Sequence, residues 1–185
     1  MPSPVSRNHA TPHARLIGWL SAYEAYTPGV EIGDNATLLL DEDNEPQPDA
    51  LLRILPEHGG QSGNSAQGEY IQGSPELIAE IAASSASYDL HDKKTAYRRN
   101  GVREYVVWRV RQDAVDWLIL REGCFEPLIP GADGILRSET FPGLWLAADA
   151  LLHNDMPRVL EVVQQGVASE QHQAFVQRLS ERLER

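Results

Sequence analysis

Three side chains have the types and the order along the chain that metal-dependent phosphate chemistry needs. Asp49 follows Pro48 at the start of one apolar segment, Glu80 lies inside a second, and Lys93 begins a helical segment. A lone ionised carboxylate such as that of Glu80 is costly among apolar residues unless it is paired or bound to a metal. Two carboxylates on neighbouring strands can hold a hard divalent ion such as Mg²⁺. A nearby ammonium group can then orient the attacking water and stabilise the charge of the transition state.

Each of these residues also has an ordinary structural interpretation. Asp49 can turn the chain at the start of its segment, and Glu80 can be a carboxylate at a strand edge in contact with water. Lys93 lies four residues after Asp89, and a solvated pair at that spacing contributes only about 0.3–0.5 kcal/mol to stability. We favour the functional interpretation for all three residues. Tyr97, one helical turn after Lys93, is interpreted as a packing residue that anchors the helix.

The elements that must position these residues are strands and helices that follow one another along the chain. The run 76–83 is assigned to a buried strand because it is short, nearly all apolar and bounded by residues that break helices. The spacing of Leu90, Ala96 and Tyr97 predicts a helix that ends at Gly101. The predicted strands are 36–40, 49–55, 70–71, 76–83, 103–110, 115–120 and 124–129. The predicted helices are 14–26, 89–100, 159–163 and 174–183, with a break near Gly166, and residues 144–152 are predicted to form a short helix or turn.

Other kinds of catalytic site find little support in the sequence. The chain contains no phosphate-binding glycine loop, no H-E-x-x-H and no G-x-S-x-G. The single cysteine, Cys124, lies in a predicted strand and is interpreted as a packing residue. The six histidines (9, 13, 58, 91, 153 and 172) are interpreted as surface or loop residues rather than metal ligands.

Length and composition predict one compact domain. The chain has 185 residues, of which 42% are hydrophobic and 23% charged, which is enough for a single sizeable core. We expect residues 1–13 to form a flexible N-terminal lead and residues 14–185 to form the domain, with a helical C-terminal tail. Because the sequence shows no signal-peptide core, no long apolar run and only one cysteine, we expect a cytoplasmic protein without a membrane span.

The charge of the chain is negative overall but unevenly distributed. The formal net charge is −11, which argues against broad electrostatic adhesion to nucleic acid or anionic lipid. Residues 31–57 hold eight acids and one base, whereas residues 88–111 hold seven bases and three acids. The basic segment can therefore offer phosphate contacts locally, although a solvated helix face explains its arginines equally well.

At these residues the sequence resembles the PD-(D/E)XK nuclease superfamily and, within it, the bacterial "putative restriction endonuclease" domain family. The resemblance covers about residues 15–180, and its most specific part is the K-x-x-x-Y-x-x-x-G-V-x-E-Y pattern that starts at Lys93. The matching pieces are QPDALLRI (47–54), GSPELIAEIAASS (73–85), YDLHDKKTAYRRNGVREYVVW (88–108) and LEVVQQG (160–166).

The resemblance implies an α/β fold with a restriction-endonuclease-like core, in which a mixed central β-sheet is flanked by helices. Asp49 matches the aspartate of the PD motif, and Glu80 matches the acid of the E-x-K motif. The third position of that motif departs from the pattern, since Ala82 stands there, and Lys93 matches a lysine supplied by the next helix. Lys94 is the alternative lysine. Many superfamily members carry a glutamate in the first helix, and Glu24 is the candidate in this chain.

Taken together, these features predict a nuclease. We expect an endonuclease that hydrolyses phosphodiester bonds in DNA with Mg²⁺ or Mn²⁺, in which Asp49 and Glu80 bind the metal and Lys93 completes the catalytic set. A homodimer is expected because superfamily nucleases that cut both strands commonly work as dimers, with the 105–120 hairpin and the C-terminal helix as candidate interfaces. The alternative is a catalytically silent binding or assembly module that keeps the nuclease fold.

Overall fold

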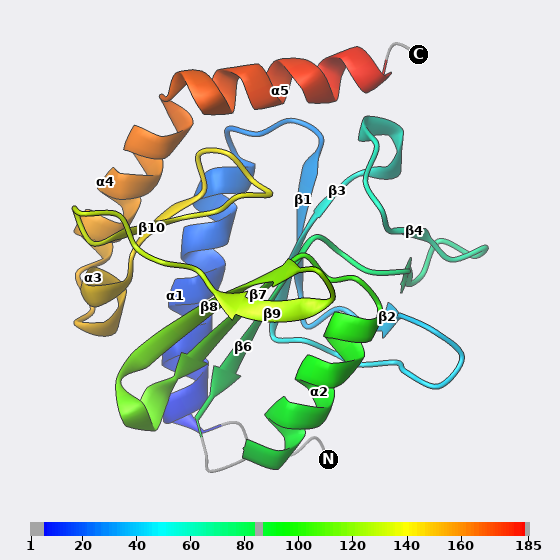
Figure 1. Cartoon of the computed structure of the whole chain (residues 1–185), viewed down its shortest axis with the longest axis horizontal. Coiled ribbons are helices and arrows are strands. Elements are labelled where there is room, and N and C mark those ends of the chain that lie inside the picture. The colour runs from blue at the N-terminus through cyan, green and yellow to red at the C-terminus, as the bar shows by residue number, and fades with distance from the viewer. Residues whose placement is uncertain (1–5, 84–86, 184–185) are drawn as a thin grey trace.

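A computed structural model describes residues 6–83 and 87–183, except for the side chains of residues 87–90. Its centre is a six-stranded mixed sheet in the order β1-β3-β6-β7-β8-β9 (Figure 1). The only parallel pair of this sheet is β6 with β7, which the helix α2 connects. The sheet strands are β1 (Val30–Asp34), β3 (Ala50–Ile54), β6 (Leu77–Ala82), β7 (Glu104–Arg109), β8 (Ala114–Arg121) and β9 (Cys124–Pro127), and α2 is Ser87–Arg99.

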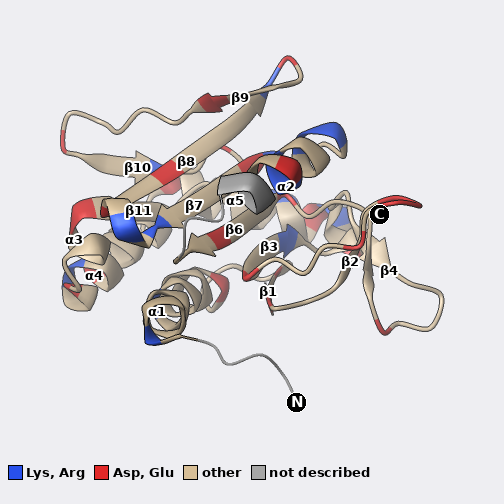
Figure 2. Cartoon of the chain, turned by 90° about the horizontal axis from the view of Figure 1, so that it is seen from below, with Lys and Arg blue, Asp and Glu red and all other residues tan. Residues whose placement is uncertain are grey.

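Two helical layers cover the sheet, and Figure 2 shows α1 (Arg7–Glu24) and α2 on opposite faces. On the α1 side, Trp19 and Leu20 pack in the larger core with residues of the C-terminal elements. On the α2 side, Tyr97 and Tyr105 belong to the second core. The C-terminal elements are β10 (Ile135–Arg137), β11 (Trp145–Ala147), α3 (Ala148–Leu152), α4 (Met156–Val167) and α5 (Glu170–Leu183).

Short segments complete the structure at the edge of the α2 face. A three-stranded sheet in the order β2-β5-β4 adds Leu38 and Ile71 to the second core. These strands are β2 (Leu38–Leu39), β4 (Gly63–Asn64) and β5 (Ile71–Gln72), and the 3-10 turns are η1 (Pro56–His58) and η2 (Val110–Gln112). The predicted fold class, a mixed sheet flanked by helices, is therefore confirmed.

The first helix begins at Arg7, seven residues before the predicted start. The expectation of a flexible lead through residue 13 is therefore wrong for residues 7–13, which form the first turns of α1. The segment lacks apolar periodicity and contains Pro12, which disfavour a helix locally. In these first turns, His9 and His13 contact Asp49, which lies far along the sequence.

Other predictions fail where tertiary packing overrides local pattern. Residues 144–152 contain a strand, β11, before the short helix α3. The break predicted near Gly166 lies at residues 168–169, between α4 and α5, and Gly166 itself lies inside α4, where a Cβ atom would come within 2.1 Å of the Gly143 carbonyl oxygen. Cys124 is exposed on the edge strand β9 and does not pack in the core, whereas His172 is buried rather than on the surface.

The 105–120 hairpin, expected to form a dimer interface at the surface, lies inside the sheet. Strands β7 and β8 are interior to the sheet because β9 pairs with β8 and forms the edge. Tyr105 is only 1% exposed, so the start of this hairpin is core rather than surface. Among the described residues, no helix is both long enough and apolar enough to cross a membrane.

Candidate active site

The pairing of β3 with β6 brings Asp49 and Glu80 side by side. Ala50 lies opposite Ala79 and Leu51 opposite Ile78, so the antiparallel register places Asp49, just before β3, opposite Glu80. Side chains opposite each other in an antiparallel pair lie on the same face of the sheet. Asp49 is fixed in this position because its Oδ2 accepts a hydrogen bond from the backbone N–H of Ile81 at 2.6 Å. The two carboxylates thus share one end of the α2 face.

Glu80 is buried and fully engaged. Its side chain is 5% exposed, and Lys93 Nζ donates to Oε1 at 2.9 Å and to Oε2 at 3.0 Å. The hydroxyl of Tyr97 donates to Oε1 at 2.8 Å. Burial raises the pKa of Glu80, whereas the charge and hydrogen bonds of Lys93 and the hydroxyl of Tyr97 act in the opposite direction. The ammonium group therefore supplies the pairing that a buried carboxylate requires.

Helical periodicity explains why Lys93 and Tyr97 reach the same carboxylate. They are four residues apart on α2, so both side chains lie on the face that packs against the sheet. Lys94, about 100° further around the helix, lines a separate pocket over β7 and β8. Lys93 is thus the lysine of α2 that contacts Glu80. The side chain of Asp89, the alternative partner for Lys93, lies outside the described residues.

Two histidines that the sequence analysis placed on the surface or in loops also contact this cluster. His9 Nε2 lies 3.1 Å from Asp49 Oδ1, and His13 Nε2 lies 2.9 Å from the Asp49 carbonyl oxygen and 3.0 Å from Asp34 Oδ1. The four-residue spacing of His9 and His13 puts both on one face of α1. That spacing is visible in the sequence, but it becomes informative only if the helix is extended to residue 7.

Glu24 does not join the site. It is the last residue of α1, fifteen residues beyond His9, which corresponds to about 22 Å along the helix axis. Its Oε1 accepts a hydrogen bond from the backbone N–H of Ile32 at 2.9 Å, which ties the end of the helix to β1. The first-helix residues that contact Asp49 in this structure are His9 and His13.

The donor set near Asp49 and Glu80 fits a hard divalent cation. Magnesium is typically held by one or two carboxylates and completes its shell with water and substrate oxygens. No group of three or more histidine, cysteine, aspartate or glutamate side chains with metal-binding geometry occurs among the described residues. A cation at this site would therefore depend on the two carboxylates and on oxygen atoms from outside the protein, and Lys93 would have to give up at least one oxygen of Glu80.

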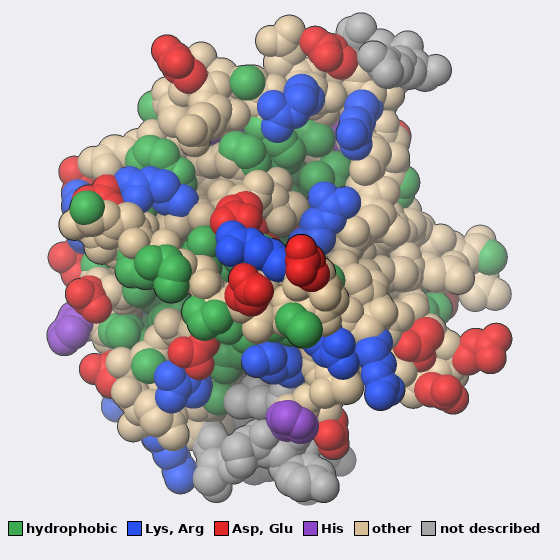
Figure 3. Space-filling model, viewed as in Figure 1, with side chains coloured by type: hydrophobic (Ala, Val, Ile, Leu, Met, Phe, Trp, Pro, Cys, Tyr) green, Lys and Arg blue, Asp and Glu red, His purple; other side chains and the backbone are tan. Residues whose placement is uncertain are grey.

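The surroundings of the site are locally basic although the whole chain is acidic. Figure 3 shows Lys and Arg side chains gathered over α2, and this helix carries Lys93, Lys94, Arg98 and Arg99. Arg98 donates to the carbonyl oxygen of Gly123 at 2.9 Å, and Arg99 is exposed. A polyanion can approach the carboxylates along this helix in spite of the net charge of −11.

Comparison with known proteins places the chain among nucleases. A family model described as "Putative restriction endonuclease" (Uma2) matches residues 1–149. A crystal structure described as a putative nuclease belonging to DUF820, from Anabaena variabilis, is similar with a TM-score of 0.56 and 12% sequence identity. The similarity covers 82% of this chain and 84% of that chain, and at this identity it supports the fold alone. No match to a curated protein is found.

Proposed function

The chain belongs to the "Putative restriction endonuclease" family, a family of nucleases, and on this premise we propose that it is a metal-dependent endonuclease that hydrolyses phosphodiester bonds in DNA. The observation that carries the proposal is the contact of Lys93 with both carboxylate oxygens of Glu80, on the same sheet face as Asp49. A buried acid paired with a lysine beside a second acid is an arrangement expected of a catalytic site.

The roles of the residues follow from their chemistry. Asp49 and Glu80 would hold Mg²⁺ or Mn²⁺, which would supply Lewis-acid polarisation of the phosphate. Lys93 would place a positive charge where the phosphate gains negative charge and would orient the attacking water. Tyr97 holds Glu80 in position through its hydroxyl, and His9 holds the free oxygen of Asp49. In the reaction, the water oxygen would bond to phosphorus as the bond from phosphorus to the leaving sugar oxygen breaks. The water would lose one proton to solvent, and the leaving sugar oxygen would take up one proton from solvent.

Metal-induced stabilisation tests the metal ligands without requiring turnover. Millimolar Mg²⁺ or Mn²⁺ should raise the melting temperature of the wild-type protein, because the ion binds the folded chain and hardly binds the unfolded chain. Asp49→Asn and Glu80→Gln should abolish that shift and also the nicking of a supercoiled plasmid. Asp133→Asn is the matched control, since Asp133 is an exposed carboxylate paired with Arg137. An unchanged metal-induced shift in Asp49→Asn would place the metal elsewhere.

One observation favours the alternative, a catalytically silent binding or assembly module. All four carboxylate oxygens of Asp49 and Glu80 already have partners, which are the side chains of His9, Lys93 and Tyr97 and the N–H of Ile81. If these contacts are too stable to be displaced, the protein binds nucleic acid without cutting it. Binding of a DNA fragment with neither a metal-induced shift nor cleavage would support this alternative over the nuclease.

We propose in addition that the protein works as a homodimer, since nucleases of the superfamily it resembles that cut both strands commonly work as dimers. The C-terminal helix α5 remains the candidate interface, because the 105–120 hairpin lies in the interior of the sheet. Light scattering after gel filtration at micromolar concentration should give about twice the chain mass of 20.6 kDa. A mass near that of one chain would rule out the dimer.

A further inference from the structure

A pocket of about 270 Å³ lies beside the candidate active site, between α2 and the strands β7 and β8. Val107 and Leu118 of the two strands form its floor, and His91 and Lys94 of α2 line the pocket from the helix side. The volume lies just below the range of about 300–1,000 Å³ that is usual for small-molecule sites. The pocket can therefore take one small ring system but not a longer ligand.

The strand register connects this pocket to the catalytic residues. Glu80 lies opposite Val107 on β7, and Val107 lies opposite Asp116 on β8. Neighbouring strands are about 4.8 Å apart, so the floor of the pocket begins roughly one strand from Glu80 and ends about two strands away. On α2, Lys94 directly follows Lys93. If a phosphate of the substrate lies at Asp49 and Glu80, the group next to that phosphate in the substrate can thus reach the pocket.

The lining has both apolar and polar parts. Val107 and Leu118 offer an apolar surface for the face of a ring, and Lys94 offers a cation for a phosphate. Arg109 and Asp116 form an ion pair at the wall, in which Arg109 Nε donates to Oδ2 at 2.6 Å and Nη2 donates to Oδ1 at 3.0 Å. An apolar floor with a few polar groups is the usual make-up of a site that binds an aromatic ring with hydrogen-bonding edges.

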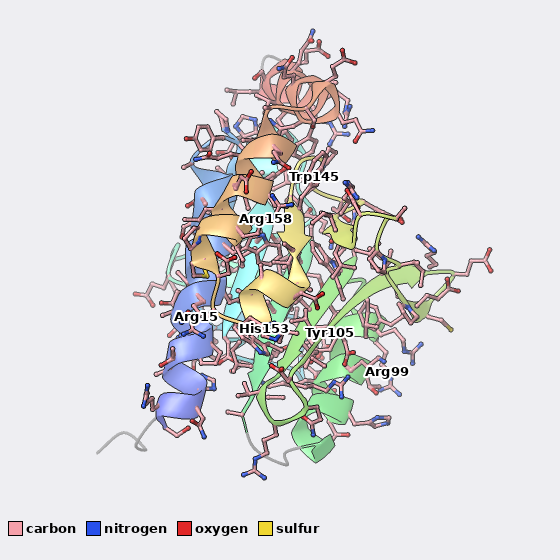
Figure 4. The ribbon with its side chains drawn as sticks, turned by 90° about the vertical axis from the view of Figure 1, so that its left-hand side faces the viewer. Arg15, Arg99, Tyr105, Trp145, His153 and Arg158 are labelled. Atoms are coloured by element: carbon pink, nitrogen blue, oxygen red, sulfur yellow. The ribbon has the colours of Figure 1, made fainter. Side chains whose placement is uncertain are left out.

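Tyr105 adds an aromatic ring to this lining. It is 1% exposed, and its hydroxyl has no hydrogen-bond partner within the part of the chain that the structure describes. Figure 4 shows Tyr105 on the same side of the sheet as Arg99, opposite Arg15 of α1. Because the hydroxyl is itself buried, Tyr105 contributes its ring rather than its hydroxyl to the lining of the pocket.

We propose that this pocket receives the base of one unpaired nucleotide adjacent to the bond that is cut. The base would lie on Val107 and Leu118, and Lys94 would contact a neighbouring phosphate. This inference rests on the proposed nuclease function and specifies its substrate class. A base in a duplex is stacked and paired, so it enters such a pocket only after it is unstacked. The preferred substrate is therefore single-stranded DNA or a duplex with an unpaired nucleotide at the cleavage position.

Nucleotide binding tests the pocket in the absence of cleavage. Deoxyadenosine 5′-monophosphate should bind the metal-free protein in a calorimetric titration, and deoxyribose 5-phosphate should bind more weakly. Loss of the contact with one base corresponds to a weakening of roughly 5- to 150-fold. Leu118→Trp should weaken nucleotide binding by that factor because the indole fills the pocket. Leu160→Trp is the matched control, since Leu160 is exposed on α4. If Leu118→Trp does not fold, Lys94→Glu on the surface of α2 serves instead and should weaken nucleotide binding by charge repulsion.

Cleavage of oligonucleotides separates this proposal from the proposed function. A duplex with one unpaired nucleotide should be cut faster than the fully paired duplex, and an abasic residue in place of the unpaired nucleotide should remove the advantage. If the protein binds the nucleotide, loses that binding in Leu118→Trp and cuts no substrate, the proposed base pocket stands and the proposed nuclease activity is wrong. Cleavage without nucleotide binding and without preference for the unpaired nucleotide would overturn the pocket and leave the nuclease intact.

Discussion

Lys93 is the residue on which the candidate catalytic set depends most directly. Its ammonium group contacts both oxygens of Glu80, and it is the only cation that does so among the described residues. In Lys93→Ala we expect kcat for DNA cleavage to fall by roughly 10²–10⁴-fold, the usual range for a positioned acid–base or electrostatic group. Steady-state cleavage of a labelled oligonucleotide measures this loss.

The same substitution should lower stability, because it leaves a buried carboxylate without its partner. We expect Lys93→Ala to lose about 1–3 kcal/mol of unfolding free energy at neutral pH, and Lys93→Ala combined with Glu80→Gln to recover most of it. Lys94→Ala provides the contrast, since Lys94 lines the neighbouring pocket and does not contact Glu80. This substitution should raise KM rather than lower kcat. Wild-type kcat in Lys93→Ala would refute the catalytic role of this lysine.

At the scale of elements, Glu104 at the start of β7 holds a distant loop against the sheet. It is completely buried and accepts hydrogen bonds from Trp117 Nε1, the Ser138 hydroxyl and the backbone N–H groups of Glu139 and Thr140. Burial raises the pKa of Glu104, and these donors act against that rise. The loop between β10 and β11 is therefore held against the sheet by one carboxylate.

Removing that carboxylate should be strongly destabilising. In Glu104→Ala, several buried donors lose their acceptor at once, so we expect a loss of about 2–5 kcal/mol in the free energy of unfolding. Urea denaturation at neutral pH measures this loss. Glu126→Ala is the control, because Glu126 is half-exposed and its contact with Arg121 is long at 3.6 Å, so its removal should cost little. Equal stability of the two variants would show that the loop is held by other contacts.

The docking of α5 should depend on pH through His172. This histidine is 3% exposed, its Nε2 lies 3.0 Å from the Thr27 hydroxyl, and that hydroxyl donates to the Tyr23 carbonyl oxygen. The imidazole is therefore the donor to Thr27. Burial lowers the pKa of His172, so the unfolded chain takes up a proton before the folded chain does as the pH falls.

The sign of the pH effect follows from this order of protonation. The stabilisation from His172 is fully present above the unfolded pKa of about 6.5 and is lost as the pH falls through the lower pKa of the folded protein. We expect the melting temperature of His172→Gln to decline less between pH 7.5 and pH 5 than that of the wild type, since glutamine can donate to Thr27 without titrating. Identical declines in the two proteins would contradict a role for His172.

At the scale of the whole molecule, the net charge and the local charge on α2 differ, and this difference bears on the proposed binding of DNA. The chain carries a net charge of −11, whereas α2 carries four bases, so under the proposed function we expect α2 to attract the nucleic acid. Figure 4 shows Arg99 on the α2 side of the sheet and Arg158 of α4 on the other side. These two arginines make a matched pair for testing which face meets the nucleic acid.

We expect Arg99→Ala to weaken DNA binding and to reduce the slope of log affinity against log salt concentration by roughly one, as the loss of one phosphate contact should. Arg158→Ala should leave both quantities unchanged. Fluorescence anisotropy with the metal-free protein at several salt concentrations measures the slope without cleavage. Equal salt slopes for Arg99→Ala and the wild type would show that DNA approaches by another face.

The sequence by itself determined the parts of this protein that depend on short-range pattern. The buried run at β6, the β-branched run at β7 and the helix between them are visible as local periodicity, and together they predict a mixed sheet. The four-residue spacing of Lys93 and Tyr97 also predicts that both face the sheet. Each of these inferences needs only residues within about one turn of a helix or one strand.

Tertiary structure alone decided which side chains meet across long separations. The helix start at Arg7, the approach of His9 and His13 to Asp49, and the burial of His172 each involve residues at least 36 positions apart. Tertiary structure likewise places Gly166, inside α4, against the backbone of Gly143, where no side chain would fit. Local propensity contains no term for such contacts, and packing free energy outweighs the propensity of a single residue, so only the folded chain reveals them.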